Sequence, residues 1–153
     1  MARTHLKIFT PQRGFSLIET LVVVGILSII AVFALGSLRG VRSRAALSDG
    51  QILIVRALEE ARNRAVTGAG TSDHGVHIEP GKIETFEGSV YIPGSGVESF
   101  LPPGVSTDQA NAIVIFKRLV GQSSANPTIM LSNVSGATST VAVTLDGAII
   151  PSL

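Results

Sequence analysis

Residues 14–19 read Gly-Phe-Ser-Leu-Ile-Glu, and an apolar run extends from Thr20 to Leu38. Glu19 is the one ionisable side chain in this whole stretch. As a helix, residues 15–38 would be about 36 Å long, because about 24 residues rise about 1.5 Å each, and the hydrocarbon layer of a bilayer is about 30 Å thick. The stretch therefore predicts a membrane-spanning helix over residues 15–38.

A secretory signal peptide is the competing interpretation of an apolar segment near the N-terminus. Its apolar core has only about 7 to 15 residues, carries no acid and ends at small residues. Ala34 and Gly36 would supply such a cleavage site. The length of the run and the acid at Glu19 favour the spanning helix.

Glu19 has two readings from the residues alone. A carboxylate at membrane depth costs several kcal/mol unless it finds a partner, so such an acid is a candidate functional residue. Alternatively, Ser16 is the N-cap of the helix and Glu19, three residues later, completes a capping box that the helix dipole also favours. Both roles can apply to the same side chain at different stages.

The glycine, the phenylalanine, the acid four residues further on and the apolar helix together resemble the class III signal of type IV prepilins and type II secretion pseudopilins. The resemblance implies that a prepilin peptidase in the inner membrane cuts after Gly14 and methylates the new N-terminus at Phe15. It also implies that the N-terminal helix then polymerises with other pilin or pseudopilin subunits. In such a polymer, the Phe15 amine of a neighbouring subunit is a cation that can pair with Glu19, and its ordinary pKa of about 7.7 to 8.0 keeps it mostly protonated at neutral pH.

Charge is distributed unevenly along the chain. Residues 1–14, the predicted cleaved leader, carry three basic side chains and no acid, so the remainder has nine basic and eleven acidic residues. A mildly acidic mature chain is not a general polyanion binder, and DNA is not expected as a partner. Three arginines also follow the apolar run, at residues 39, 42 and 44, so the positive-inside rule leaves the orientation open. The family resemblance implies a single-pass protein of the inner membrane whose head lies outside the cytoplasm, before it joins a periplasmic or cell-surface filament.

The remaining helical pattern is amphipathic. Apolar residues recur mostly every three or four positions up to Ala65, so one helix is expected from about Ser16 to Val66, with residues 39–67 packed on a globular domain. Gly68-Ala69-Gly70 should end it.

Residues 68–153 read as a β-rich globular head. Alternation and turn residues predict strands, and the predicted strands are 76–79, 83–86, 89–92, 112–116 (central), 128–131, 140–145 and 148–150. The connections are predicted to include a long loop over 93–111, rich in glycine and proline, and a two-residue hairpin turn at Asp146-Gly147.

The resulting fold class is α+β: a long N-terminal helix packs on an antiparallel β domain that is curled or split in two. The family resemblance implies that this is a pilin-like fold. This layout is similar to the H-type minor pseudopilins and related minor pilins, which implies a minor, structural subunit that works with the inner-membrane assembly machinery and with membrane lipid before assembly.

No catalytic or cofactor site is expected. The chain has no cysteine, no G-x-S-x-G elbow and no phosphate loop, so the function is predicted to be non-enzymatic and without cofactors. His74 and His77, together with Asp73 and Glu79, could suggest a metal site. However, residues three apart on a strand point to opposite faces, which favours solvated hairpin residues over a metal site. Asn133-Val134-Ser135 fits a glycosylation sequon, although most matches to so short a pattern are unused loops. Lys82, Lys117 and Arg118 are a candidate basic patch, and a solvated edge is the favoured interpretation of them. The alternative function is a single-span anchored enzyme or binding module whose N-terminal motif is coincidental.

Overall fold

A computed structural model describes residues 14–152 of the chain, apart from the side chains of residues 34–39. The predicted leader, residues 1–14, therefore lies outside the described residues except for Gly14. The chain divides into two units, Met1–Leu38 and Arg39–Leu153, which are described separately below.

Helix α1, Leu17–Thr67, accounts for all the helical structure in the described residues. It begins after Ser16, whose carbonyl accepts the first helical hydrogen bond from Thr20 N at 3.1 Å. It ends at Gly68, which has φ +67° and donates to Ala65 O at 3.2 Å. Glycine is the usual residue for such a left-handed cap, because a Cβ is disfavoured there. The predicted helix, about 16 to 66, is thus confirmed to within one residue.

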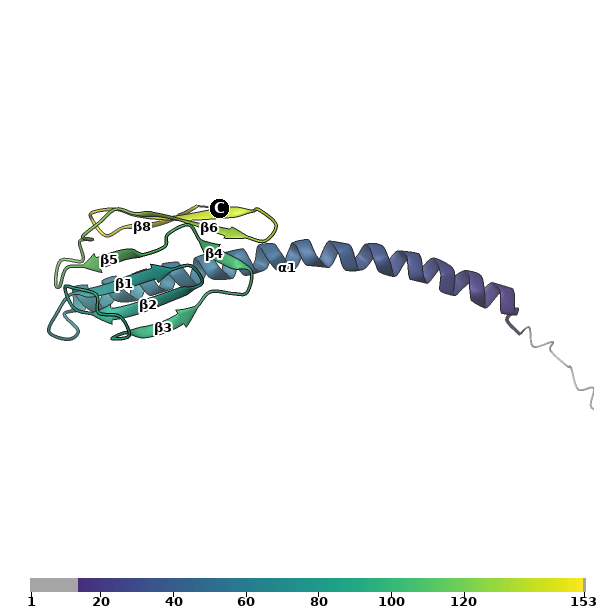
Figure 1. Cartoon of the computed structure of the whole chain (residues 1–153), viewed down its shortest axis with the longest axis horizontal. Coiled ribbons are helices and arrows are strands. Elements are labelled where there is room, and N and C mark those ends of the chain that lie inside the picture. Colours follow the sequence, from purple (N-terminus) through teal and green to yellow (C-terminus); the bar gives the residue numbers. More distant parts are fainter. Residues whose placement is uncertain (1–13, 153) are drawn as a thin grey trace, which may run out of the picture. The chain divides into compact units, whose positions relative to one another are not determined.

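In the rest of the described chain, eight strands form two antiparallel sheets of four. Figure 1 shows how the sheets are arranged. The first sheet has the order β3-β2-β1-β5 and the second has the order β4-β6-β7-β8. The strands are β1 (His74–Glu79), β2 (Lys82–Glu87), β3 (Val97–Phe100), β4 (Val105–Thr107), β5 (Ala112–Phe116), β6 (Thr128–Asn133), β7 (Thr138–Val143) and β8 (Ile149–Ser152).

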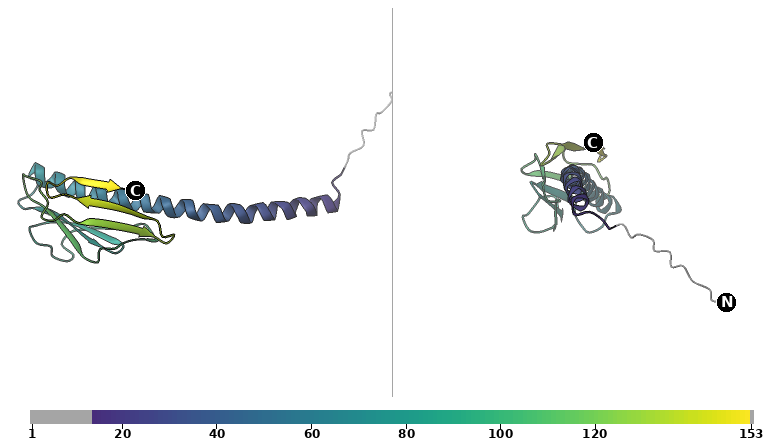
Figure 2. Two further views of the ribbon diagram at one scale, coloured as in Figure 1. Left: turned by 90° about the horizontal axis from the view of Figure 1, so that it is seen from above. Right: turned by 90° about the vertical axis from the view of Figure 1, so that its right-hand side faces the viewer.

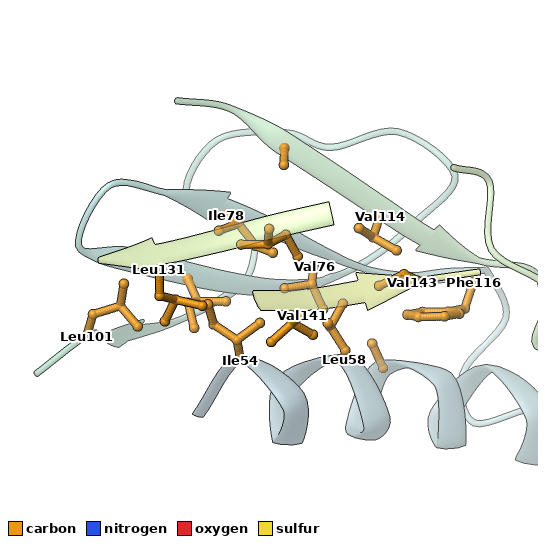
Figure 3. Close-up of a cluster of buried hydrophobic side chains, with 14 of the residues drawn as sticks. Ile54, Leu58, Val76, Ile78, Leu101, Val114, Phe116, Leu131, Val141 and Val143 are labelled. Atoms are coloured by element: carbon orange, nitrogen blue, oxygen red, sulfur yellow. The ribbon is translucent and has the colours of Figure 1, made fainter. Parts of the chain in front are cut away.

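Both sheets lie alongside the amphipathic half of α1, residues 39–67 (Figures 1 and 2). Ile54 and Leu58 on the helix are fully buried, and they belong to one core with residues of both sheets (Figure 3). The helix also holds the C-terminal strand, because Gln51 Nε2 donates to Thr140 O at 3.1 Å and to Ser152 O at 3.2 Å. The fold is α+β, an N-terminal helix packed on an antiparallel β domain, and it is consistent with a pilin-like fold.

The predicted strand at residues 89–92 is wrong. Residues 88–96 form a loop instead, because Tyr91 turns inward and stacks on His77, with ring centroids 4.0 Å apart. Strand β3 comes later, at Val97–Phe100, and with β4 it lies inside the region predicted to be a long loop. Glycine and proline marked the turns of this region correctly but concealed two short edge strands between them.

Two other sequence expectations change in detail. Strand β5 is confirmed, but it is an edge strand of its sheet, and Ile113 is 36% exposed. The final hairpin is also confirmed, but its turn has three residues: Gly147 N donates to Thr144 O at 2.9 Å, and Thr144 N donates to Ala148 O at 2.9 Å. Gly147 has φ +79°, the conformation that a three-residue loop requires at its last position.

Candidate processing and assembly site

The predicted cleavage site lies just before α1. Gly14, Phe15 and Ser16 are exposed and adopt neither helix nor strand, and in the described part of the chain no heavy atom beyond the neighbouring residues lies within 4 Å of a Cβ built on Gly14. A peptidase needs access to non-helical backbone, which this geometry provides for the Gly14–Phe15 bond. The structure leaves the cleavage and the methylation of Phe15 as predictions.

Ser16 and Glu19 occupy the positions that a helix start requires. The backbone and hydroxyl of Thr20 both donate to Ser16 O, at 3.1 and 3.2 Å, and Glu19 is the acid of the first turn. Among the described residues, no side-chain hydrogen bond joins Ser16 to Glu19, and none of them forms an ion pair with Glu19. The capping and assembly roles therefore stay predictions, and the carboxylate is exposed and available to another molecule.

Apolar side chains cover this part of α1 on every side. Consecutive residues of a helix are about 100° apart, so Val22, Val23 and Val24 already point in three directions. All the large apolar residues from 15 to 33 are exposed, from 48% for Val23 to 82% for Phe15 and Leu17. They are Phe15, Leu17, Ile18, Leu21, Val22, Val23, Val24, Ile26, Leu27, Ile29, Ile30, Val32 and Phe33. A helix that is apolar all round is typical of a segment buried in a membrane or inside an assembly.

Within the part of the chain that the structure describes, no helix combines the length and the apolar character that crossing a membrane demands. The last side chains of the predicted span, residues 34–38, lie outside the described ones. The span over residues 15–38 remains a prediction.

Small residues leave a hollow on this apolar surface. It measures about 440 Å³ and is lined by Leu17, Thr20, Leu21, Val24 and Gly25. Nothing lies within 4 Å of a Cβ built on Gly25, so the backbone is open to close approach there. In membranes, where no hydrophobic driving force acts between helices, small residues at an interface let two helix backbones approach closely.

The head contains a buried polar cluster that the sequence pattern did not indicate. Glu84 on β2 is fully buried, and it accepts hydrogen bonds from Tyr91 Oη at 2.6 Å and from Gly96 N at 2.8 Å. The hydrogen bond from Tyr91 lowers the pKa of Glu84 despite its burial, and the same bond raises the pKa of Tyr91 to about 12. Alternation along β2 directs Glu84 away from the core residue Ile83, and the loop over residues 88–96 covers Glu84 there through Tyr91 and Gly96.

The two histidines are buried, contrary to the expectation of solvated hairpin residues. His74 is 5% exposed, and its Nε2 lies 2.6 Å from Ala69 O. His77 is 2% exposed, bonds through Nε2 to Asn111 Oδ1 and stacks on Tyr91. Their opposite directions on β1 follow the strand alternation, and among the described residues no three His, Asp or Glu side chains converge as metal ligands.

One small hollow in the head collects ionisable residues. It has a volume of about 220 Å³, and Glu60, Arg64, His74 and Glu87 contribute to its lining. These groups already have partners: Arg64 pairs with Glu60, His74 bonds to Ala69 O, and Glu87 accepts from Thr71 N at 3.0 Å.

The candidate basic patch does not form. Lys82 begins β2 and pairs with Glu98 at 2.9 Å and with Glu79 at 3.5 Å. Lys117 and Arg118 follow the other end of β5, since Ile78 pairs with Ala112 and His74 pairs with Phe116 in the β1–β5 register. Lys82 is thus at one end of the first sheet, and Lys117 and Arg118 are at the other end.

Comparison with known protein families finds a match at the N-terminus. The model of the prokaryotic N-terminal methylation motif matches residues 10–35. No curated protein and no solved structure matches the chain. The matched residues include the Gly14–Phe15 bond, Glu19 and most of the apolar run. The motif and the α+β fold support the type IV pilin and pseudopilin family in the broad sense, and they point to a structural, prepilin-like substrate of prepilin peptidase.

Proposed function

We propose that this chain is a structural, minor subunit of a type IV pilus-like filament or a type II secretion pseudopilus. Prepilin peptidase cuts it after Gly14 and methylates Phe15. The mature protein is held in the inner membrane by residues 15–38, with its head outside the cytoplasm. The inner-membrane assembly machinery then inserts it into a filament through its N-terminal helix.

The apolar surface of α1 is the observation that carries this proposal. Thirteen large apolar side chains between residues 15 and 33 are at least 48% exposed. Burial of apolar surface is worth about 25 cal/mol per Å², so such a segment is unstable in water. Lipid before assembly and neighbouring helices after assembly both remove it from water. An anchored enzyme would need the first of these environments, whereas a filament subunit needs both.

In this proposal, Glu19 helps to set the register between neighbouring subunits of the filament. In lipid or in a filament core, its carboxylate requires a positive partner. Cleavage after Gly14 creates an amine at Phe15, and methylation leaves its charge in place. The exposed, unpaired carboxylate of the described chain is free to meet that amine on a neighbouring subunit.

The processing step is tested by the intact mass of the native protein. We expect a chain that begins at Phe15 and carries one added methyl group, and we expect Gly14→Asp to retain the leader. A native chain that begins at Met1, or near Ser37, would favour the anchored enzyme or binding module with a coincidental motif.

The assembly step and the identity of the machine need the native complex. Cross-linking followed by co-purification should recover other pilin-like subunits. Secretion components would assign a pseudopilus, and pilus components would assign a pilus. Recovery of the processed protein as a monomer under all conditions that assemble its neighbours would argue against a filament role.

A further inference from the structure

The turn between β6 and β7 holds an exposed valine in a rigid frame. Val134 is 83% exposed. Asn133, which precedes it, is only 8% exposed, and its Oδ1 accepts hydrogen bonds from Ser135 N and Ala137 N, both at 3.0 Å. Asn133 Nδ2 also donates to Ser43 O on α1 at 3.0 Å, so this nitrogen is occupied and unsuited to carry a glycan. The valine is therefore fixed outward, although an apolar side chain gains nothing from water.

This valine closes an apolar groove at one end of the head. The groove measures about 430 Å³ and is lined by Arg42, Ser43, Ala46, Pro103, Gly104 and Val134. The loop between β3 and β4 is tied to the turn, because Val134 N donates to Gly104 O at 3.2 Å. The lining of the groove thus comes from the first turns of the amphipathic half of α1 and from two loops of the β domain.

The part of α1 that borders the groove carries positive charge only. Arg42 and Arg44 are exposed, and no acid occurs between Leu38 and Asp49. The groove lining itself contains no acid. At the β1–β2 turn, Glu79 is already paired with Lys82 at 3.5 Å. The groove therefore complements a surface with two adjacent layers: an apolar layer for the groove lining and an anionic layer for the two arginines.

We propose that this end of the head docks on the anionic surface of the membrane, with Val134 and Pro103 in the interfacial layer and with Arg42 and Arg44 on lipid phosphates. The inference rests on the proposed function, because it takes residues 15–38 to be anchored in the bilayer. Arg42 comes four residues after Leu38, which is about 6 Å of helical rise. The polar layer on each side of the hydrocarbon is about 5 to 8 Å thick, so the start of the groove falls at headgroup depth. Arginine side chains and exposed apolar side chains are both favourable there.

Antiparallel topology supplies a matched control. The β6–β7 and β7–β8 turns lie at opposite ends of the second sheet, since β7 pairs antiparallel with both neighbours. Leu145 in the β7–β8 turn is 57% exposed, so it is a second exposed apolar residue at the far end. The chain has no cysteine, and single spin labels can be introduced by Val134→Cys, Leu145→Cys and, within the apolar run, Val24→Cys.

The test uses the full processed chain, one copy per lipid nanodisc. Nanodiscs of phosphatidylcholine alone are compared with nanodiscs that also contain phosphatidylglycerol. Power saturation then measures how far each label is accessible to a water-soluble relaxing agent and to oxygen. With anionic lipid, we expect the label at 134 to be shielded from the water-soluble agent and the label at 145 to stay accessible. Each arginine is worth about fivefold in the ratio of docked to undocked heads, so Arg42→Gln with Arg44→Gln should lower that ratio about thirtyfold, and high salt should act in the same direction.

The outcomes separate the docking from the anchoring. If the label at 24 is in the hydrocarbon but labels at 134 and 145 are equally accessible to water, the docking inference is wrong and the anchoring survives. If the label at 24 is itself accessible to water, the proposed membrane anchoring fails. Shielding at 134 that appears only with two or more copies per disc would assign the groove to a second copy of the chain, which also overturns the lipid assignment. Equal shielding in both lipids would refute the role of the arginines.

Discussion

Tyr91 should ionise near pH 12 instead of near its ordinary pKa of 10.0. Its hydroxyl donates to the buried carboxylate of Glu84 at 2.6 Å, and the nearby negative charge opposes the formation of a tyrosinate. At pH 11, a phenol with a pKa of 10.0 is about nine-tenths ionised, whereas one with a pKa of about 12 is about one-tenth ionised. The difference is large enough to measure at a single pH.

The assay is the near-ultraviolet absorbance of tyrosinate, which the sequence makes simple. The chain contains one tyrosine and no tryptophan, so the whole signal belongs to Tyr91. Circular dichroism at each pH reports whether the head is still folded. Because the folded pKa is raised, the contribution of Tyr91 to stability is complete below pH 10.0 and is lost as the pH rises through about 12.

Two controls define the result. The chain unfolded in urea should titrate near 10.0, and Glu84→Gln, which removes the charge but keeps a hydrogen-bond acceptor, should bring the folded midpoint back toward that value. A wild-type head that is folded at pH 11 and already mostly ionised at Tyr91 would refute the Tyr91–Glu84 contact and the burial of the polar cluster beneath it.

The remaining predictions concern acid stability, the core and assembly. Since the pKa of Glu84 is lowered below 4.5, its charged form stabilises the head above that pH, and the free energy of unfolding should fall with the pH below it; urea titrations of Glu84→Gln should show a weaker dependence. Leu58→Ala removes a fully buried side chain and should cost about 2 to 5 kcal/mol in chemical denaturation, while Ile52→Ala, at a 45% exposed position of the same helix, should cost less than about 1 kcal/mol. Glu19→Gln keeps the shape but removes the charge, so the intact mass should still show cleavage while the fraction of subunit in sheared filaments drops; unchanged incorporation would count against charge pairing.

The N-terminal site could be predicted from the sequence because its residues are neighbours along the chain. The glycine, the phenylalanine and the acid lie within six residues, and the apolar helix follows directly. Helix caps, turn residues and period are properties of neighbours along the chain, so α1 and the β1–β2 hairpin were also predictable. The strand at 89–92 was not, because its apolar residues fit an edge strand as well as they fit a loop. The contact between Tyr91 and His77, 14 positions apart, decided between the two.

By itself, the sequence determined the cleavage motif, the long helix, the absence of disulfides and the antiparallel β character of the head, since each depends on residue type and short-range spacing. Only the tertiary structure decided that Glu84 and His77 are buried, that Lys82 is far from Lys117, and that Val134 is fixed outward at a groove beside Arg42. These outcomes depend on which distant segments cover which face. Burial and charge pairing depend on residues that are far apart in the sequence. Strand registers bring these residues together, and no short sequence pattern encodes those registers.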